Sequence, residues 1–294
     1  MIANKKAKLF FAIAGASCSG KTRIRRSLLD FLDQDYITYL DMDGYHMHDR
    51  EERHRYSEFP DQPEANDFSR LCNNLTEYRH GAPVIVPVYN HQTGSFGKPE
   101  KIIQKPVIIV EGLHALKIND ICDKNLVDFG VFLDPEDDLR YSWKVKRDVF
   151  ERSYTYHDAV EQIELREPFV RQHVLNQRKK ADAIVLITSS CSGKVLYNVV
   201  LTQNIIDKNK ILQDIFSLST VMGQEPYMPG SNYFLITKIH LNQFIKTMRR
   251  SDLIPFPLRF NKIKRLSFLG SYNYMIQCLI SIIMALKSNF ARDE

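Results

Sequence analysis

Residues 9–22 read LFFAIAGASCSGKT. The apolar run at 9–14 has the length and composition of a buried parallel strand, and residues 15–22 match the phosphate-loop pattern G-x-x-x-x-G-K-[ST]. Residues 21–31 then carry apolar side chains at helical spacing. A strand that enters a helix through a glycine-rich turn aims backbone N–H groups and the positive helix end at one point. The stretch therefore predicts a polyphosphate site, as in nucleotide-binding enzymes.

Each loop residue has an expected role. Lys21 is expected to reach the β- and γ-phosphates of a nucleotide, and the Thr22 hydroxyl to ligate Mg²⁺. A chance glycine turn is the alternative, but all fixed positions are filled and both flanking elements are indicated. The other loop residues are expected to hold the phosphates, and they are Gly15, Ala16, Ser17, Cys18, Ser19 and Gly20.

Strand and helix patterns alternate over the first 190 residues. Short apolar runs at 36–40, 84–89, 107–110, 129–133 and 184–187 read as strands, 68–79 and 139–180 read as helical, and 46–67 reads as loop. Such alternation predicts an α/β fold of the P-loop NTPase type, with a parallel sheet and helices on both faces. Ligands of such sheets lie at the carboxyl ends of the strands, which is where Gly15, Asp43 and Glu111 fall.

The last third of the chain differs in pattern and charge. We expect a kinase-sized domain at 1–200 and a mainly helical appendage at 201–294. The net charge is +5, yet residues 201–294 hold 12 Lys and Arg against 6 Asp and Glu. That basic excess fits a solvated or intersubunit face better than a nucleic-acid surface, so nucleic acid is not an expected partner. The basic residues are Lys246, Arg249, Arg250, Arg259, Lys262, Lys264 and Arg265.

Cysteine usage and hydropathy suggest a cytoplasmic protein. The five cysteines show no C-x-x-C pair, and their odd number favours a reducing compartment without a disulfide framework. The first strand begins so early that we expect no signal peptide. The most apolar segment, 274–286, contains Gln277 and is too short for a membrane span, so it is expected to be a buried helix.

A partial repeat of the phosphate-loop sequence occurs at 190–194, where SCSGK is identical to residues 17–21. Thr188 replaces the first glycine of the pattern, and Val195 replaces the hydroxyl residue that binds the metal. The second copy lacks the parts that cradle phosphate and metal. We therefore interpret it as a coincidence.

Phosphoryl transfer to a hydroxyl also needs a group that accepts the hydroxyl proton. Asp43 has a suitable position after the strand at 36–40, and Asp41 would face the same side if the strand continued. The alternative is that both residues simply begin a polar loop. The residues alone leave this choice open.

Five further segments resemble phosphoribulokinases. They are DGYH at 43–46 followed by Arg50 and Arg53, PEANDF at 63–68, VPVYNHQTG at 86–94, VEGLH at 110–114 and WKVKRDVFER at 143–152. The matches occur in family order and cover roughly residues 9–187. The wider group includes uridine kinases, which share the phosphate loop, a D-x-F-Y segment, E-G and an R-D-x-x-E-R-G lid. The YNH and EAND segments favour the ribulose 5-phosphate side.

The resemblance implies a role for each matching residue. Asp43 would be the general base, Glu111 would join Thr22 at Mg²⁺, and Arg152 would belong to a lid over ATP. Lys144 and Arg147 would neutralise the transferring phosphoryl group, and Asp148 would orient them or the metal. The residues implied to bind a sugar phosphate are His46, Arg50, Arg53, Tyr89 and His91. The alternative for the 144–152 helix is an exposed basic face, paired with Asp148 and Glu151.

The resemblance implies ATP-dependent phosphorylation of D-ribulose 5-phosphate to ribulose 1,5-bisphosphate, in a homo-oligomer that binds ATP and Mg²⁺. A kinase of uridine, cytidine or another sugar phosphate is the first alternative. The second is an inactive nucleotide-binding regulator, although Lys21, Thr22, Asp43 and Asp148 together argue against lost turnover. One departure stands out, because Ser153 occupies the position of the glycine that usually follows the lid arginine.

Overall fold

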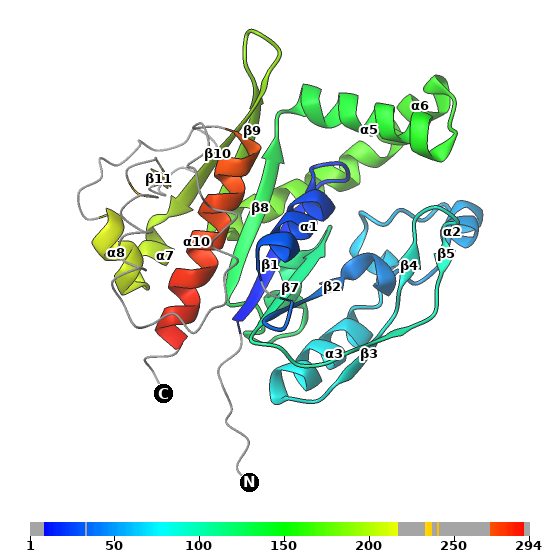
Figure 1. Ribbon diagram of the computed structural model, residues 1–294. Helices are drawn as coiled ribbons and strands as arrows, with labels where there is room; N and C mark the ends of the chain where they lie inside the picture. The colour runs from blue at the N-terminus through cyan, green and yellow to red at the C-terminus, as the bar shows by residue number, and fades with distance from the viewer. Residues whose placement is uncertain (1–8, 33, 217–232, 237–239, 241–270, 291–294) are drawn as a thin grey trace.

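The computed structural model describes residues 9–32, 34–216, 233–236, 240 and 271–290. The centre of these residues is a seven-stranded sheet with the order β11-β10-β9-β8-β1-β7-β2 (Figure 1). Strands β2, β7, β1, β8 and β9 are parallel, whereas β10 pairs antiparallel with β9 and with β11. The sheet strands are β1 Leu9–Gly15, β2 Ile37–Asp41, β7 Val107–Gly112, β8 Phe129–Pro135, β9 Ala183–Ser189, β10 Val195–Thr202 and β11 Tyr233–Leu235.

Helices and short elements fill the connections. The α-helices are α1 Lys21–Phe31, α2 Arg50–Tyr56, α3 Phe68–His80, α4 Ile118–Ile121, α5 Asp137–Arg152, α6 Tyr156–Phe169, α7 Gln203–Asp207, α8 Lys210–Phe216 and α10 Tyr272–Phe290. The tighter or wider turns are η1 Met42–Tyr45, η2 Pro63–Ala65, η3 Ala115–Lys117, η4 Val170–Val174 and η5 Leu175–Lys180. Two small antiparallel pairs lie outside the main sheet, β3 Val84–Val86 with β6 Glu100–Ile102 and β4 Tyr89–Asn90 with β5 Ser95–Phe96.

Helices cover both faces of the sheet. Successive residues of β1 point to opposite faces, so they belong to two different core clusters. Phe11 and Ile13 belong to a core cluster shared with α1, α7, α8 and α10. Phe10 and Ala12 belong to the other cluster, which α3, η3 and α4 complete. Burial on both faces explains why the central strands read as continuous apolar runs rather than as alternating ones. The predicted α/β parallel-sheet fold is confirmed.

The described residues beyond 201 join the same sheet. Strand β11 pairs with β10, and α10 packs against α1, β1 and β10. Tyr274 is fully buried and donates a hydrogen bond to the carbonyl of Ile236 (2.7 Å). Within the described residues, no helix is both long enough and apolar enough to cross a membrane. The domain division at residue 200 stays a prediction, and the basic residues at 246–265 lie outside the described residues.

The segment 46–67 is predicted to be loop, and this prediction is wrong at residues 50–56 and 63–65. It contains helix α2, which begins with a reciprocal capping box between Asp49 and Glu52. The helix ends at Ser57, whose left-handed backbone (φ 53°) stops it after seven residues. A helix this short and polar has no apolar face for a sequence pattern to reveal.

The expectation that the cysteines form no disulfide is also wrong. Cys72 on α3 and Cys122 after α4 form a disulfide with their Cα atoms 5.4 Å apart, although 50 residues separate them in sequence. The described free cysteines are Cys18, Cys191 and Cys278. The bond ties α3 to the neighbouring α4 on one face of the sheet. Sequence spacing alone could not show that these two helices meet.

The second SCSGK copy lies at the tip of the β9–β10 hairpin, which projects beyond the sheet in Figure 1. There Gly193 is left-handed (φ 74°) and donates its N–H to the carbonyl of Ser190 (2.8 Å). A hairpin tip has no helix start at which phosphate N–H donors converge. The structure agrees with the interpretation that this copy is no phosphate loop.

Candidate active site

A cavity of about 940 Å³ lies at the carboxyl ends of β1, β2 and β7. Eight of its lining residues are Lys or Arg and five are Asp or Glu, which leaves a surplus of positive charge facing anionic ligands. The structure therefore brings the phosphate loop, Asp43 and Glu111 together at one edge of the sheet. Predicted site residues that line the cavity are Ser17, Cys18, Gly20, Lys21, Thr22, Asp43, His46, Arg50, Arg53, Tyr89, His91, Glu111, Arg147 and Arg152.

The phosphate loop depends on its two glycines. A Cβ atom on Gly15 would lie 2.6 Å from Ser19 Oγ and 2.9 Å from the Leu133 carbonyl, so only glycine fits. Gly20 adopts φ 94° and is the N-cap of α1. Lys21 folds back and donates to the carbonyls of Gly15 (2.8 Å) and Ala16 (3.0 Å). Burial lowers the pKa of Lys21, which a nearby anion would restore.

The expected Mg²⁺ residues meet beside the loop. Thr22 Oγ1 lies 3.4 Å from Glu111 Oε1, and the buried Oε2 atom of Glu111 has no hydrogen-bond partner. A hydroxyl and a carboxylate are oxygen donors of the kind that Mg²⁺ takes alongside phosphates and water. The residues present therefore fit the ion. Among the described residues, no group of three His, Cys, Asp or Glu forms a protein-only metal site.

Arg25 was missed by sequence reasoning. Its Nη1 atom lies 3.2 Å from Glu111 Oε1 and 3.8 Å from Asp41 Oδ2. Position 25 is one helical turn beyond Lys21, so the 3.6-residue period of α1 was the signal that could have placed it near the loop. The positive charge of Arg25 offsets the repulsion between the carboxylates of Asp41 and Glu111 at the strand ends.

Asp43 stands on the turn η1, which begins directly after β2. Asp41 accepts the Asp43 N–H (3.0 Å), so the strand geometry stops there, yet both residues line the cavity. Burial opposes ionisation of Asp43, but the nearby His46, His91 and Lys21 outweigh it and lower its pKa. Burial, Asp43 and Glu111 raise the pKa of Asp41 to about 7. Asp43 is thus the carboxylate suited to accept a proton at neutral pH.

Gly44 fixes the place of this turn. A Cβ atom there would collide with the carbonyl group of Pro87, at the junction of β3 and β4. Because glycine has no side chain, the two backbones touch. The turn that carries Asp43 therefore lies directly on the segment that leads to Tyr89.

Two arginines of α2 face the other side of the cavity. Arg53 donates to the Tyr89 hydroxyl (2.8 Å), which in turn donates to the Gly94 carbonyl (2.9 Å). Arg50 donates to the His91 carbonyl (2.6 Å). Within the described residues, neither guanidinium forms an ion pair with a carboxylate. No carboxylate of the described residues therefore offsets either positive charge.

Helix α5 gathers three cations on one carboxylate. Asp148, which is 2% exposed, pairs with Lys144, with Arg147 (2.7 Å) and with Arg152 (3.5 Å). Arg147 also donates to Ser17 Oγ of the phosphate loop (2.8 Å). Burial, Arg166 and Arg147 lower the pKa of Lys144 to about 8. Arg147 and Arg152 line the cavity, while Lys144 and Asp148 are buried in the helix packing.

Ser153 resolves the departure from the lid pattern. It is the C-cap of α5 with φ 59° and ψ 26°, the left-handed backbone that glycine adopts without strain. Serine therefore adopts the backbone conformation that the family pattern assigns to glycine.

Gly15, Ala16 and Ser19 belong to the buried part of the phosphate loop, where Ala16 and Ser19 are each 2% exposed.

Part of the chain matches a known protein family. The description "Phosphoribulokinase / Uridine kinase family" belongs to a family model that matches residues 10–192. The chain belongs to this family. This match confirms the resemblance seen in the motifs. Membership of the phosphoribulokinase/uridine kinase family implies ATP as the phosphoryl donor.

Two relatives illustrate the range of the family. The phosphoribulokinase of Synechocystis sp. is 32% identical over 179 residues, which are 61% of this chain and 53% of that protein. A uridine kinase of Staphylococcus epidermidis is 31% identical over 205 residues, which are 67% of this chain and 96% of that protein. The chain thus spans about half the length of the phosphoribulokinases it matches.

The fold has a counterpart among solved structures. The phosphoribulokinase from Rhodobacter spheroides superposes with a TM-score of 0.60 at 14% identity, covering 98% of this chain and 99% of that one. At this identity the likeness shows the fold alone. The roles of the individual site residues stay predictions.

Proposed function

We propose that this protein transfers the γ-phosphoryl group of ATP to the 1-hydroxyl of D-ribulose 5-phosphate, giving ribulose 1,5-bisphosphate and ADP. The observation that carries the proposal is the pair Arg50 and Arg53. Both residues line the cavity, and their guanidinium groups donate to the His91 carbonyl and the Tyr89 hydroxyl, with no carboxylate partner among the described residues. A phosphate group on the acceptor supplies the missing negative charge.

The proposed chemistry begins at Asp43. Its carboxylate accepts the proton of the acceptor hydroxyl while that oxygen bonds to the γ-phosphorus. The bond from this phosphorus to the bridging oxygen of ADP breaks, and ADP leaves with the electron pair. Lys21, Arg147 and Arg152 offset the charge that spreads over the phosphoryl oxygens.

Mg²⁺ fits beside Thr22 and Glu111, and when bound it supplies charge neutralisation at the β- and γ-phosphates. Thr22 offers its hydroxyl from the first turn of α1, and Glu111 offers the buried Oε2 atom that lacks a partner. Arg25 holds the other oxygen of Glu111 in place (3.2 Å).

Uridine or cytidine phosphorylation is the second candidate. It is favoured by the uridine kinase match, which covers 96% of that protein. A nucleoside acceptor carries no phosphate, however, and leaves Arg50 and Arg53 without a counter-charge. A regulator without turnover is less consistent with the site, because it has no use for an ionised Asp43 set between two histidines.

The test is an acceptor panel of ribulose 5-phosphate, ribose 5-phosphate and uridine, assayed by ADP release with purified protein. We expect turnover with ribulose 5-phosphate. Arg50→Gln and Arg53→Gln should each raise its KM by about 10- to 100-fold, the value of one or two lost charge-assisted hydrogen bonds.

Arg55→Gln is the matched control, because Arg55 lies on the same helix but is 64% exposed and pairs only with Glu51 in the described structure. An unchanged KM in the Arg50 and Arg53 variants would contradict the phosphate-binding role. Turnover with uridine alone would establish the second candidate. ATP binding without turnover on any acceptor would favour the regulator.

The cytoplasmic location and the homo-oligomeric state are further parts of the proposal. Light scattering of the purified full chain tests the second, and a monomer would contradict it. Fractionation of cells that express the protein tests the first.

A further inference from the structure

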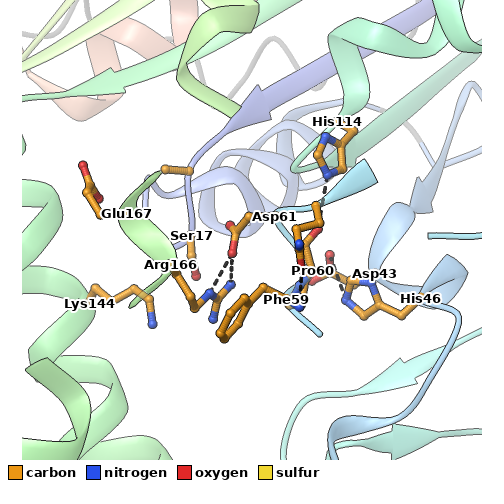
Figure 2. Close-up of polar contacts among 12 residues, drawn as sticks. Ser17, Asp43, His46, Phe59, Pro60, Asp61, His114, Lys144, Arg166 and Glu167 are labelled. Carbon is orange, nitrogen blue, oxygen red and sulfur yellow. Dashed lines mark hydrogen bonds and ion pairs between the residues drawn. The ribbon is translucent and has the colours of Figure 1, made fainter. Parts of the chain in front are cut away.

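The strip Phe59–Gln62 includes Phe59, Pro60 and Asp61, which lie between Arg166 of α6 and Asp43 in Figure 2. Asp61 in this strip is completely buried. Its Oδ2 atom accepts hydrogen bonds from Arg166 Nε (2.7 Å) and pairs with Arg166 Nη2 (2.5 Å). Phe59 packs against Phe169 of the same helix, with ring centroids 5.7 Å apart. The strip is therefore fixed to α6 by an ion pair and by an aromatic contact.

The next link runs through the carbonyl of Pro60. It accepts a hydrogen bond from His114 Nε2 (3.2 Å) and another from the Asn66 side-chain amide (3.2 Å). The same Asn66 nitrogen donates to the Gln62 carbonyl (2.9 Å). Because both carbonyls can only accept, they fix which end of the Asn66 side chain is the nitrogen. The Asn66 oxygen must then point the other way.

That oxygen meets His46. Asn66 Oδ1 lies 3.0 Å from His46 Nδ1, and an amide oxygen can only accept a hydrogen bond. His46 therefore carries a hydrogen on Nδ1, and its Nε2 atom is the one that faces Asp43 Oδ1 at 3.8 Å. The strip thus sets both the ring orientation and the tautomer of the histidine beside the proposed base.

We propose that Asp61 and Arg166 are positioning residues, which hold His46 against Asp43 through Pro60 and Asn66 and so align the acceptor hydroxyl. This inference rests on the proposed function, in which Asp43 accepts the hydroxyl proton. Arg166 also lines the cavity, and its charge helps lower the pKa of Lys144 on α5. Arg166 thus links the strip beside His46 and Asp43 to the cations of α5.

A purely structural ion pair is the competing explanation, and it makes a different prediction. Loss of one partner leaves a buried charge, which destabilises the fold whatever the role of the pair. Replacing both partners by apolar residues of similar size removes both charges and spares the fold. The double variant Asp61→Leu/Arg166→Met therefore separates the two explanations.

The first measurement is the ¹⁵N spectrum of His46 in histidine-labelled protein, assigned with His46→Gln. In the unaltered protein we expect the tautomer with hydrogen on Nδ1. In the double variant, we expect the spectrum to show a mixture of tautomers, because the strip loses its ion pair with α6 and Asn66 is held less firmly. Arg166→Lys, which keeps the charge, should restore most of the original signal.

The second measurement is steady-state kinetics with ribulose 5-phosphate. The double variant should lose about 10- to 100-fold in kcat/KM for the acceptor, the scale expected when a reacting group is misplaced by about 1 Å. The dissociation constant of a non-hydrolysable ATP analogue should stay within about twofold, since the phosphate loop is untouched. Arg171→Gln is the control. Arg171 lies just after α6 and pairs with Glu167 of that helix, but its side chain is 58% exposed.

An unchanged His46 spectrum in the double variant overturns the inference, as does unchanged acceptor kinetics. If the double variant does not fold, Asp61→Asn/Arg166→Gln replaces it, since this variant also removes both charges but keeps polar side chains. If the unaltered protein fails to phosphorylate ribulose 5-phosphate, the proposed function fails. The histidine spectrum needs no acceptor, so it still decides the positioning role.

Discussion

The Nε2 atom of His91 lies 3.4 Å from a carboxylate oxygen of Asp43, and the two residues come from separate parts of the fold. Asp43 is on the turn after β2, whereas His91 follows β4 outside the main sheet. His46 approaches the other oxygen of the carboxylate at 3.8 Å. Two imidazole rings thus flank one carboxylate, and each ring favours its ionised form when the ring is protonated.

Replacing Asp43 by Asn should lower kcat by about 10²- to 10⁴-fold, because the variant cannot accept the hydroxyl proton. The dissociation constant of an ATP analogue should change little. Rapid-quench measurement of a single turnover checks the chemical step directly. Asp30→Asn on the exposed side of α1 is the control, and a kcat for Asp43→Asn within about twofold of the control would remove the base from the mechanism.

We expect the pKa of Lys144, lowered to about 8 mainly by burial, to set a limit on activity at alkaline pH. Lys144 is charged below that pH and neutral above it, so kcat/KM should fall as the pH rises through about 8. Lys144→Arg should keep its charge and move the fall to higher pH. Initial rates between pH 6.5 and 9.5 test this, and a fall at the same pH in both proteins would contradict it.

We expect the protonation of His114 to make the free energy of unfolding depend on pH. Burial lowers its pKa from an ordinary 6.5 to about 4, so its contribution is complete above pH 6.5 and is lost as the pH falls through about 4. The loss amounts to at most about 3 kcal/mol. Urea unfolding at several pH values should show this loss in the unaltered protein, and a smaller loss in His114→Gln, which keeps a donor for the Pro60 carbonyl. Equal acid losses in the two proteins would count against it.

The metal prediction concerns Thr22. Thr22→Val keeps the shape of the side chain but removes the hydroxyl, so half-maximal activity should require about tenfold more Mg²⁺. Chelation with EDTA should abolish turnover, and added Mg²⁺ should restore it. Thr76→Val on α3 should match the unaltered protein. An Mg²⁺ requirement that is the same in all three proteins would exclude Thr22 as a ligand.

The Cys72–Cys122 bond closes a loop across 50 residues, and such a cross-link typically stabilises a fold by about 2–4 kcal/mol. Reductant should therefore lower the free energy of unfolding of the unaltered protein but not that of the Cys72→Ser/Cys122→Ser variant. A thiol assay on denatured, unreduced protein should count three thiols. A count of five would show that the bond is absent in solution.

Local patterns were enough to predict the phosphate loop and the parallel strands. The loop residues are consecutive, and the central strands are buried on both faces, so each signal lies within one short window. Asp43 and Glu111 could be placed together because both lie at the carboxyl ends of strands of one parallel sheet. The second SCSGK copy was correctly set aside, since Thr188 cannot replace the first glycine.

Contacts between distant segments could not be predicted from one sequence. Asp61 and Arg166 are separated by 105 residues, and each reads as an ordinary charge in a polar stretch. Cys72 and Cys122 likewise have no local pattern that pairs them. Helix α2 escaped detection because its stability comes from its capping box rather than from an apolar face.

The missing side chain of Gly44 has a consequence for how this pocket can change over evolution. With the backbone of that turn resting on the Pro87 carbonyl, an insertion on either side would push the other out of register. Descendants that accept a bulkier molecule would have to remodel the two segments as one, and substitutions there should arise in pairs.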